Sequence, residues 1–525
     1  MARMAQSDTQ SRVQLGKIAR AATLVMALFV ASRVLGLVRE MVIARQFGAG
    51  AEMDAYLAAF RVPDFLFYMV AGGALGSAFI PVFTGYLTRG DMPGAWRLAS
   101  AVINWVLLLL CALGGLAAVL APWLVQTFFG EFTPDQQALT VTLMRWMLIS
   151  TVIFGVSGVV MGILNAHQHF LLPALAPVIY NAVIIAAALM LGPTWGVRGL
   201  TAGVVAGAGA HLLVQIPGLV RRRMVYRPVL DWRDASLREV GRLMAPRVLG
   251  LAAVQLNFMV NAVLASRLPA GRLTALNYGW IIMLLPQGVI AQSVATALFP
   301  TLSALTAQGN RSEMRRIFGL TLRNLLFLTL PAAVGLLVLA TPIVRLLLQR
   351  GAFDAEDTAA TAWALGFFAL GLTGHAVVEI ATRAFYALKD TRTPVAVGVA
   401  AMGVNIGLSI VLMGLFARLG WQAHGGLALA NSIAVSLEAV VLMALLRPKM
   451  GGLSEDGMRA GLVKMGLAAA GMAAALFILT PLLPARPTWL GGLAGMGIGA
   501  GVYLLLAYLL GVDELQTVLR RLRRR

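Results

Sequence analysis

The sequence predicts an all-α polytopic membrane protein with fourteen transmembrane helices, in two pseudo-symmetric six-helix lobes around a central cavity, plus two C-terminal helices. Composition is the first observation: 59% of the 525 residues are hydrophobic and only 12% charged, with a mean hydropathy of +0.82, which excludes a water-soluble globule. The second is that the apolar residues form long unbroken runs. The third is a polar motif that recurs in both halves of the chain.

The apolar runs define the helices, because a helix needs about 20 mostly apolar residues to cross the hydrocarbon core. The runs lack the ten-residue alternation of an outer-membrane barrel, so strands are not expected. The predicted spans are residues 21–44, 62–87, 98–127, 138–166, 171–193, 197–220, 240–266, 274–305, 320–347, 358–387, 393–416, 424–446, 460–483 and 488–511.

Basic residues predict the orientation. An even number of spans places both termini on one side, whose loops and tails hold about 25 Lys and Arg against about 7 on the other side. Both termini are therefore expected in the cytoplasm, with the protein in the cytoplasmic membrane. The formal charge of +20 is explained by these loops, so no nucleic acid partner is expected. The basic loop after the sixth span and the tail are expected to lie against anionic lipid headgroups.

An internal repeat relates the two halves. Six of seven residues match between Ala31–Leu37 (ASRVLGL) and Ala245–Leu251 (APRVLGL), and weaker echoes follow in the same order. The copies begin at spans one and seven, so they share one membrane orientation, as in alternating-access transporters whose substrate site lies between parallel repeats. The predicted parts are an N-terminal cytoplasmic segment (1–20), an N-lobe (21–220), a basic cytoplasmic loop (221–239), a C-lobe (240–446), helices 13 and 14 (447–511) and a basic tail (512–525).

Charged residues inside the spans are the strongest functional signal, because each costs on the order of 2.5–3.5 kcal/mol unless it meets a partner or water. Arg33 and Glu40 are seven residues apart and share a helix face, while Arg39 points elsewhere. A guanidinium suits phosphate oxygens, so an anion site is one interpretation and an Arg–Glu structural pair is the other. Arg247 is the repeat equivalent of Arg33, and the two could clamp a diphosphate. Alternatively, Arg247 snorkels from a helix end.

Other polar residues are weaker candidates. His375 and Glu379, four residues apart, could relay protons or bind a cation, with Asn405 as a third candidate for ion coupling, or they could make ordinary interhelical contacts. Asn181, Asn257, Asn261 and Asn405 could line a cavity or join helices. The single cysteine, Cys111, excludes a disulfide framework and a cysteine-based metal site. No nucleotide-binding, zinc-protease or nucleophile motif is present, so the sequence predicts neither an enzyme nor a cofactor or metal.

Four stretches resemble one family. SRVLGLVREMVIARQFGAGAEMDAYLAAFRVPDFLF, GGALGSAFIPVF, LFPTLS and RAFYALKDTRTPV are similar to the MurJ (MviN) family of lipid II flippases, in the superfamily of multidrug, oligosaccharidyl-lipid and polysaccharide exporters. The resemblance implies movement of the undecaprenyl-pyrophosphate-linked peptidoglycan precursor from the inner to the outer leaflet. It also implies functional roles for Ser32, Arg33, Arg39, Glu40 and Asp54.

The chain departs from the family pattern at two places. Many members carry an Arg pair in helix two where this chain has Phe67 and Tyr68, and an Asp–Arg pair in helix eight where it has Trp280 and Ile281. If the cargo is that of the family, Arg247 and Arg61 are the arginines expected to contact its phosphates in place of the missing residues. Alternatively, the cargo or its mode of binding differs.

Three functions follow from these observations. The first is a lipid II flippase that works by alternating access. The alternatives are an exporter of another polyprenyl-linked glycan or amphipathic small molecule, and a membrane scaffold without transport. The expected partners are the lipid-linked precursor and membrane lipids. The protein is expected to be a monomer, and cell-wall synthesis proteins are further candidate partners.

Overall fold

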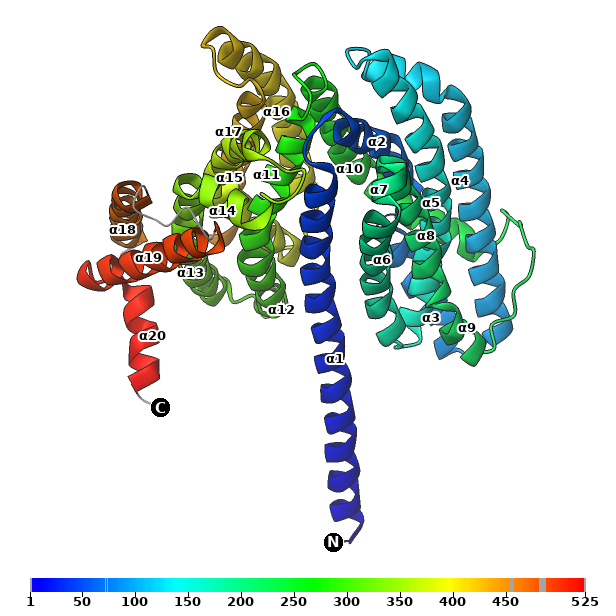
Figure 1. Ribbon diagram of the computed structural model, residues 1–525. Helices are drawn as coiled ribbons and strands as arrows, with labels where there is room; N and C mark the ends of the chain where they lie inside the picture. The colour runs from blue at the N-terminus through cyan, green and yellow to red at the C-terminus, as the bar shows by residue number, and fades with distance from the viewer. Residues whose placement is uncertain (1, 71, 73, 453–457, 481–487, 524–525) are drawn as a thin grey trace. The chain divides into compact units, whose positions relative to one another are not determined.

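The computed structural model describes residues 2–70, 72, 74–452, 458–480 and 488–523; some side chains within these ranges, among them those of residues 2–22 and Arg247, lie outside the description. All regular structure in this part of the chain is helical, as the composition predicts (Figure 1). The chain divides into two compact units, Met1–Met259 and Val260–Arg525.

The N-terminal unit is built around α5. This helix packs against α2, α3, α4 and α8, while α1 packs along α6. The helices of the unit are α1 (Ala2–Phe47), α2 (Ala51–Val70), α3 (Ala74–Thr88), α4 (Met92–Phe128), α5 (Pro134–Ala166), α6 (Leu171–Met190), α7 (Gly192–Trp195), α8 (Val197–Leu213) and α9 (Ile216–Arg221). The helix α10 (Ala235–Ala265) follows and contains the boundary between the units.

Local signals set the helix ends in this unit. The Asp91 carboxylate accepts a hydrogen bond from the Gly94 amide (2.9 Å) at the start of α4, which satisfies one of the free amides of the first turn. At the start of α5, Thr133 and Gln136 bond to each other's backbone amides, which is a capping box. Each cap lies directly before a long apolar run, so it fixes where that run becomes helical.

The C-terminal unit is built around α15. This helix packs against α11, α12, α13 and α17, and α17 packs against α16. The elements are α11 (Arg272–Pro286), the π-helix η1 (Gln287–Gln292), α12 (Ser293–Ala307), α13 (Arg311–Val338), α14 (Ala340–Leu347), α15 (Ala355–Ala387), α16 (Arg392–Arg418), α17 (His424–Met450), α18 (Met458–Leu479), α19 (Thr488–Leu509) and α20 (Asp513–Arg523).

The last helices attach to α13. The helices α18 and α19 pack against each other and against α13. At the start of α20, Glu514 accepts a hydrogen bond from the Arg323 Nε (2.5 Å), and Asp513 pairs with another nitrogen of the same guanidinium (2.9 Å). The Arg323 and Glu514 side chains are both buried, so the ion pair fixes the C-terminal helix to the unit.

Twelve of the fourteen predicted spans correspond to helices that qualify as membrane spans in the described part of the chain. Eleven are long and apolar enough on their own, and a twelfth is the pair Ala235–Ala245 and Gly250–Ala265 within α10, bent by 47°. The two that do not qualify are 21–44 and 62–87. The first lies within α1, where the described side chains begin at Thr23, so the description covers this predicted span only in part. The count of fourteen therefore stays a prediction.

The predicted span 62–87 is in fact two helices. The helix α2 begins earlier, at Ala51, and ends at Val70, where the Gly72 amide donates to the Phe67 carbonyl (2.8 Å). A Cβ on residue 72 would lie 2.8 Å from the Tyr68 backbone, so this close turn requires glycine. The predicted span 320–347 is also divided: α13 ends at Val338 and α14 carries Pro342 in its first turn, where proline needs no amide hydrogen.

The turn between α15 and α16 is fixed by one carboxylate. Asp390 accepts hydrogen bonds from the amide (3.0 Å) and the hydroxyl (2.6 Å) of Thr393, and it pairs with Lys449 of α17. The Lys449 ammonium, followed by these two Thr393 groups, holds the pKa of Asp390 well below its usual range.

Replacing Asp390 with asparagine should lower the free energy of unfolding by about 0.5–1 kcal/mol, because the ion pair with Lys449 is partly exposed. A depressed carboxyl pKa stabilises the folded state fully above about pH 4 and loses that effect only as the pH falls further. The loss should therefore be equal in thermal unfolding at about pH 6 and about pH 8. The exposed Glu131→Gln is the control, and a loss confined to one of these pH values would contradict the assignment.

Candidate functional site

The helix α1 carries the densest group of candidate residues in the N-terminal unit. Ser32 and Glu40 are half-buried, as is Arg39, whereas Arg33 is exposed. The helix packs along α6, which supplies the partner for one of the two arginines. The two arginines of this segment consequently have different surroundings.

Arg39 is held by two partners. Its Nε lies 3.2 Å from the Glu40 Oε1, and its NH2 bonds to the same oxygen. Its NH1 donates to the Asn181 Oδ1 of α6 (3.0 Å), and the Asn181 amide lies 3.4 Å from the Ser32 carbonyl. The side chains of Arg39 and Glu40 are 26% and 13% exposed, so this is a largely buried pair joined to a buried amide.

Arg33 has no hydrogen bond or ion pair with any residue that the structure describes. Its guanidinium carbon lies 5.4 Å from the centre of the Phe29 ring, a cation–π contact within its own helix. The Arg33–Glu40 structural pair considered from the sequence does not form, because Glu40 pairs with its neighbour Arg39. No described residue therefore occupies the five N–H donors of the Arg33 fork, which are open to a ligand or to water.

Two further charged residues lie on α2. Arg61 and Asp64 are three residues apart, and each lies in the electrostatic field of the other. The Arg61 Nε is buried and has no hydrogen-bond partner, which is costly for a guanidinium and leaves a donor for a ligand. Asp54, in the first turn of the same helix, is 3% exposed.

Three candidates lie on α10, namely Arg247, Asn257 and Asn261. Asn257 is half-buried. Arg247 is in the helix, but its side chain lies outside the described residues, so its pairing with Arg33 stays a prediction.

The helix-two positions where the resemblance predicts an arginine pair hold aromatic contacts here. The Phe67 ring contacts Tyr68 (5.5 Å between centroids) and Phe154 of α5 (6.0 Å). Phe154 also contacts Tyr180 of α6 and His211 of α8. These rings join four helices of the unit, so the departure from the family pattern serves packing.

The ion-coupling candidates lie in the C-terminal unit with separate partners. The His375 Nε2 is 3.2 Å from the Asn431 Oδ1, and its ring contacts Trp280 (5.4 Å). Glu379 accepts a hydrogen bond from Arg383 of the next turn (3.0 Å). No group of three or more His, Cys, Asp and Glu that could hold a metal occurs among the residues described.

Asn405 and Asn261 both lie within hydrogen-bond distance of the Ser409 hydroxyl. The Ser409 Oγ lies 3.3 Å from the amide oxygens of both, so it donates to one of them at a time. This contact joins α10 to α16 inside the C-terminal unit, which fits the helix-joining role considered for these asparagines.

A polar network that the sequence did not reveal lies at the start of α4. The segment between α9 and α10, residues 222–234 (the strap), runs along this helix. The Asn104 amide donates to the carbonyls of Arg227 (3.2 Å) and Val229 (3.0 Å) and accepts from the Tyr226 hydroxyl (2.6 Å). The Ser100 hydroxyl accepts from the Arg227 amide (3.1 Å).

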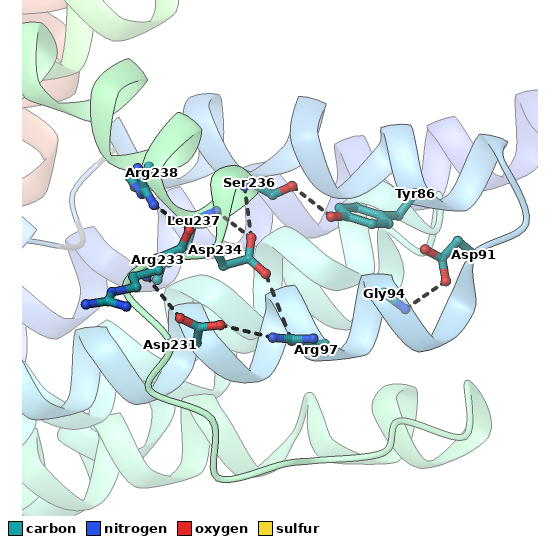
Figure 2. Close-up of polar contacts among 10 residues, drawn as sticks. All are labelled: Tyr86, Asp91, Gly94, Arg97, Asp231, Arg233, Asp234, Ser236, Leu237 and Arg238. Carbon is teal, nitrogen blue, oxygen red and sulfur yellow. Dashed lines mark hydrogen bonds and ion pairs between the residues drawn. The ribbon is translucent and has the colours of Figure 1, made fainter.

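Charged contacts continue the network to the start of α10. Arg97 pairs with Asp231 (3.1 Å) and lies 4.0 Å from Asp234 (Figure 2). Asp234 also accepts from the amides of Ser236 and Leu237, as an N-cap residue does. The Ser236 hydroxyl bonds to Tyr86 of α3 (2.7 Å). These contacts fix the strap at both of its ends.

Replacing Asn104 with alanine should release the strap. Two strap carbonyls and one hydroxyl would lose their partner at a site that is 8% exposed, with an expected loss of about 1–3 kcal/mol. Trypsin should then cut after the strap arginines faster than in the parent chain. Asn165→Ala is the matched control, since that half-buried side chain bonds to no described residue. Equal cleavage rates for Asn104→Ala and the parent would contradict the role of Asn104.

Comparisons with known proteins agree with the resemblance. A family model described as lipid II flippase MurJ matches residues 43–487. The lipid II flippase MurJ of Burkholderia cenocepacia is 31% identical over 441 residues, which cover 82% of this chain and 84% of the relative. The probable lipid II flippase MurJ of Haemophilus influenzae is 32% identical over 433 residues, 78% of this chain and 82% of the relative.

Solved structures are similar over most of the chain. A structure described as lipid II flippase MurJ in an inward closed conformation has a TM-score of 0.78 and 26% identity, and the match covers 93% of this chain and 98% of that one. An inward-facing transporter of the MATE family has a TM-score of 0.69 at 16% identity, over 82% of this chain and 98% of that one. The second similarity concerns the fold alone.

Proposed function

The chain belongs to the MurJ family of lipid II flippases, and from that premise we propose that it carries lipid II across the membrane with arginines of α1 and α2 on the pyrophosphate. Membership makes it a multi-pass membrane transporter rather than an enzyme. The cargo headgroup carries two phosphates, whose oxygens are the natural partners of planar guanidinium forks. The proposal therefore concerns which arginines supply those forks.

The unpaired state of Arg33 is the observation that carries the proposal. An exposed arginine within a membrane helix is costly against acyl chains, so it needs water or an anionic ligand. Arg33 bonds to no described side chain and can turn its donors toward a phosphate, whereas Arg39 is occupied by Glu40 and Asn181. Arg33 is accordingly assigned to the cargo and Arg39 to the support of α1.

Arg61 is the second proposed contact. The Arg61 Nε is buried and has no hydrogen-bond partner. Asp64 lies one helical turn away, and its short side chain cannot accept from all five N–H groups of the Arg61 guanidinium. A phosphate oxygen would satisfy this donor. Arg247 of α10 is the third, from its place in the repeated motif.

The proposal also covers the membrane orientation of the protein and the coupling of transport to an ion. The excess of basic residues in one set of loops supports cytoplasmic termini, and we propose a monomer that works by alternating access. His375 and Glu379, with Asn405, are the candidates for ion coupling, although their present partners are Asn431, Arg383 and Ser409.

Complementation tests the function. Expression of this chain in a bacterium depleted of its own lipid II flippase should restore growth and cell shape. The rescued cells should also expose lipid II at the outer leaflet. A chain that reaches the membrane, remains folded and restores neither growth nor exposed lipid II would contradict the proposed cargo and favour export of another polyprenyl-linked glycan.

A further inference from the structure

The strap has one face turned to the protein and one face turned away from it. Its backbone and its two aspartates bond to α4, through Ser100, Asn104 and Arg97. Figure 2 shows Asp231 and Asp234 directed at Arg97, while the Arg233 side chain extends away from Arg97. Arg97 thus holds both aspartates on the inner face, and Asp234 is held there also by the first amides of α10.

The outer face combines positive charge with apolar surface. Arg223, Arg227 and Arg233 are exposed, and their side chains form no ion pair with a described residue. Three large side chains between them are also exposed: Tyr226 by 55%, Leu230 by 51% and Trp232 by 63%. Arg233 lies 6.0 Å from the Trp232 ring. A face that mixes arginines with exposed aromatic residues is typical of the headgroup region of a membrane.

The contacts with α4 place the strap at that depth. The unbroken apolar run of α4 covers residues 105–125, about the length that crosses the hydrocarbon core. Arg97, Ser100 and Asn104 come directly before this run, so the strap that they bind lies at the boundary between hydrocarbon and headgroups. The anchoring groups are thus level with lipid phosphates rather than with bulk water.

We propose that the outer face of the strap, formed by Arg223, Arg227, Arg233, Leu230 and Trp232, is a docking surface for anionic phospholipid headgroups. The arginines bind lipid phosphates, and Leu230 and Trp232 enter the interface beside them, while the Tyr226 hydroxyl stays bonded to Asn104. The strap leads into α10 through the Asp234 cap, so bound lipid also steadies the start of that helix. This site is separate from the proposed cargo contacts.

A fluorescent label beside the strap tests the proposal. The full chain with Cys111→Ser and Ala235→Cys carries one thiol, at the exposed first residue of α10, and is reconstituted in vesicles. Quenching by headgroup-attached nitroxide lipid should be stronger in phosphatidylcholine vesicles containing phosphatidylglycerol than in phosphatidylcholine alone. Changing Arg223, Arg227 and Arg233 to glutamine should weaken lipid association of the strap about fivefold for each charge. The exposed Arg198→Gln is the control and should leave quenching unchanged.

A second measurement needs no substitution in the strap. Raising the salt concentration screens the arginines, so it should reduce quenching in the phosphatidylglycerol vesicles and leave it constant in pure phosphatidylcholine. Quenching that depends neither on phosphatidylglycerol nor on salt would overturn the proposal and assign this face to another occupant, such as a soluble protein. Neither readout requires lipid II, so failure here is distinguishable from failure of the transport proposal.

Discussion

Replacing Arg33 with alanine is expected to weaken lipid II binding about thirtyfold, because a charged hydrogen bond to an anion contributes about 2 kcal/mol. The same variant should fail to rescue a flippase-depleted bacterium. The folded protein should be unaffected, since the side chain makes only a cation–π contact with Phe29 among the described residues. Purified protein binding to lipid II in detergent gives the affinity, and thermal unfolding gives the stability.

Two further variants sharpen the result for Arg33. Arg33→Lys keeps the charge but loses the planar fork, so its affinity should lie between those of the parent and the alanine variant. Arg198→Ala removes an equally exposed arginine of the same unit and should bind lipid II like the parent. Unchanged binding by Arg33→Ala would remove this residue from the cargo site.

Replacing Glu40 with alanine is expected to lower the free energy of unfolding by about 3 kcal/mol, because it leaves the Arg39 guanidinium largely buried without its counterion. Glu40→Gln should cost less, since its amide oxygen can still accept from Arg39. Thermal unfolding of the purified variants measures both losses. Glu131→Ala, which removes an exposed glutamate, should have almost no effect. A loss for Glu40→Ala no larger than that control would show that the pair contributes nothing to stability.

The sequence predicts the helices well because each long apolar run is a local property. The run at residues 105–125 lies in the C-terminal part of α4, and the caps at Asp91 and Thr133 precede their helices. The break at Gly72 is different, because it depends on how closely that residue approaches the Tyr68 backbone. Nothing in the apolar pattern of residues 62–87 shows this distance.

The site could be predicted only in part for a related reason. The types of residue on α1 indicate charge in a membrane helix, but pairing depends on side chains brought in by other helices. The seven-residue spacing suggested Arg33 with Glu40, whereas Asn181 of α6 helps to hold Arg39 beside Glu40 instead. The role of Asn104 could not be predicted, because its partners are strap atoms more than a hundred positions away in the sequence.

The departures at Phe67 and Trp280 show the same limit. The sequence indicates that the cations expected from the resemblance are absent at Phe67, Tyr68 and Ile281, and that Trp280 replaces an expected Asp. It does not indicate that Phe67 contacts Phe154, or that Trp280 contacts His375. Aromatic packing thus occupies a position in each unit where relatives carry charge, and the phosphate contacts are assigned to other arginines of the chain.

Lipid II affinity across a double-mutant cycle tests the central claim most directly. The four proteins are the parent, Arg33→Ala, Arg247→Ala and the double variant, with stability checked for each. If both guanidinium groups grip one pyrophosphate, each single change should weaken binding at least about tenfold, and the double loss should differ from the product of the two single losses. Four equal affinities would contradict the account.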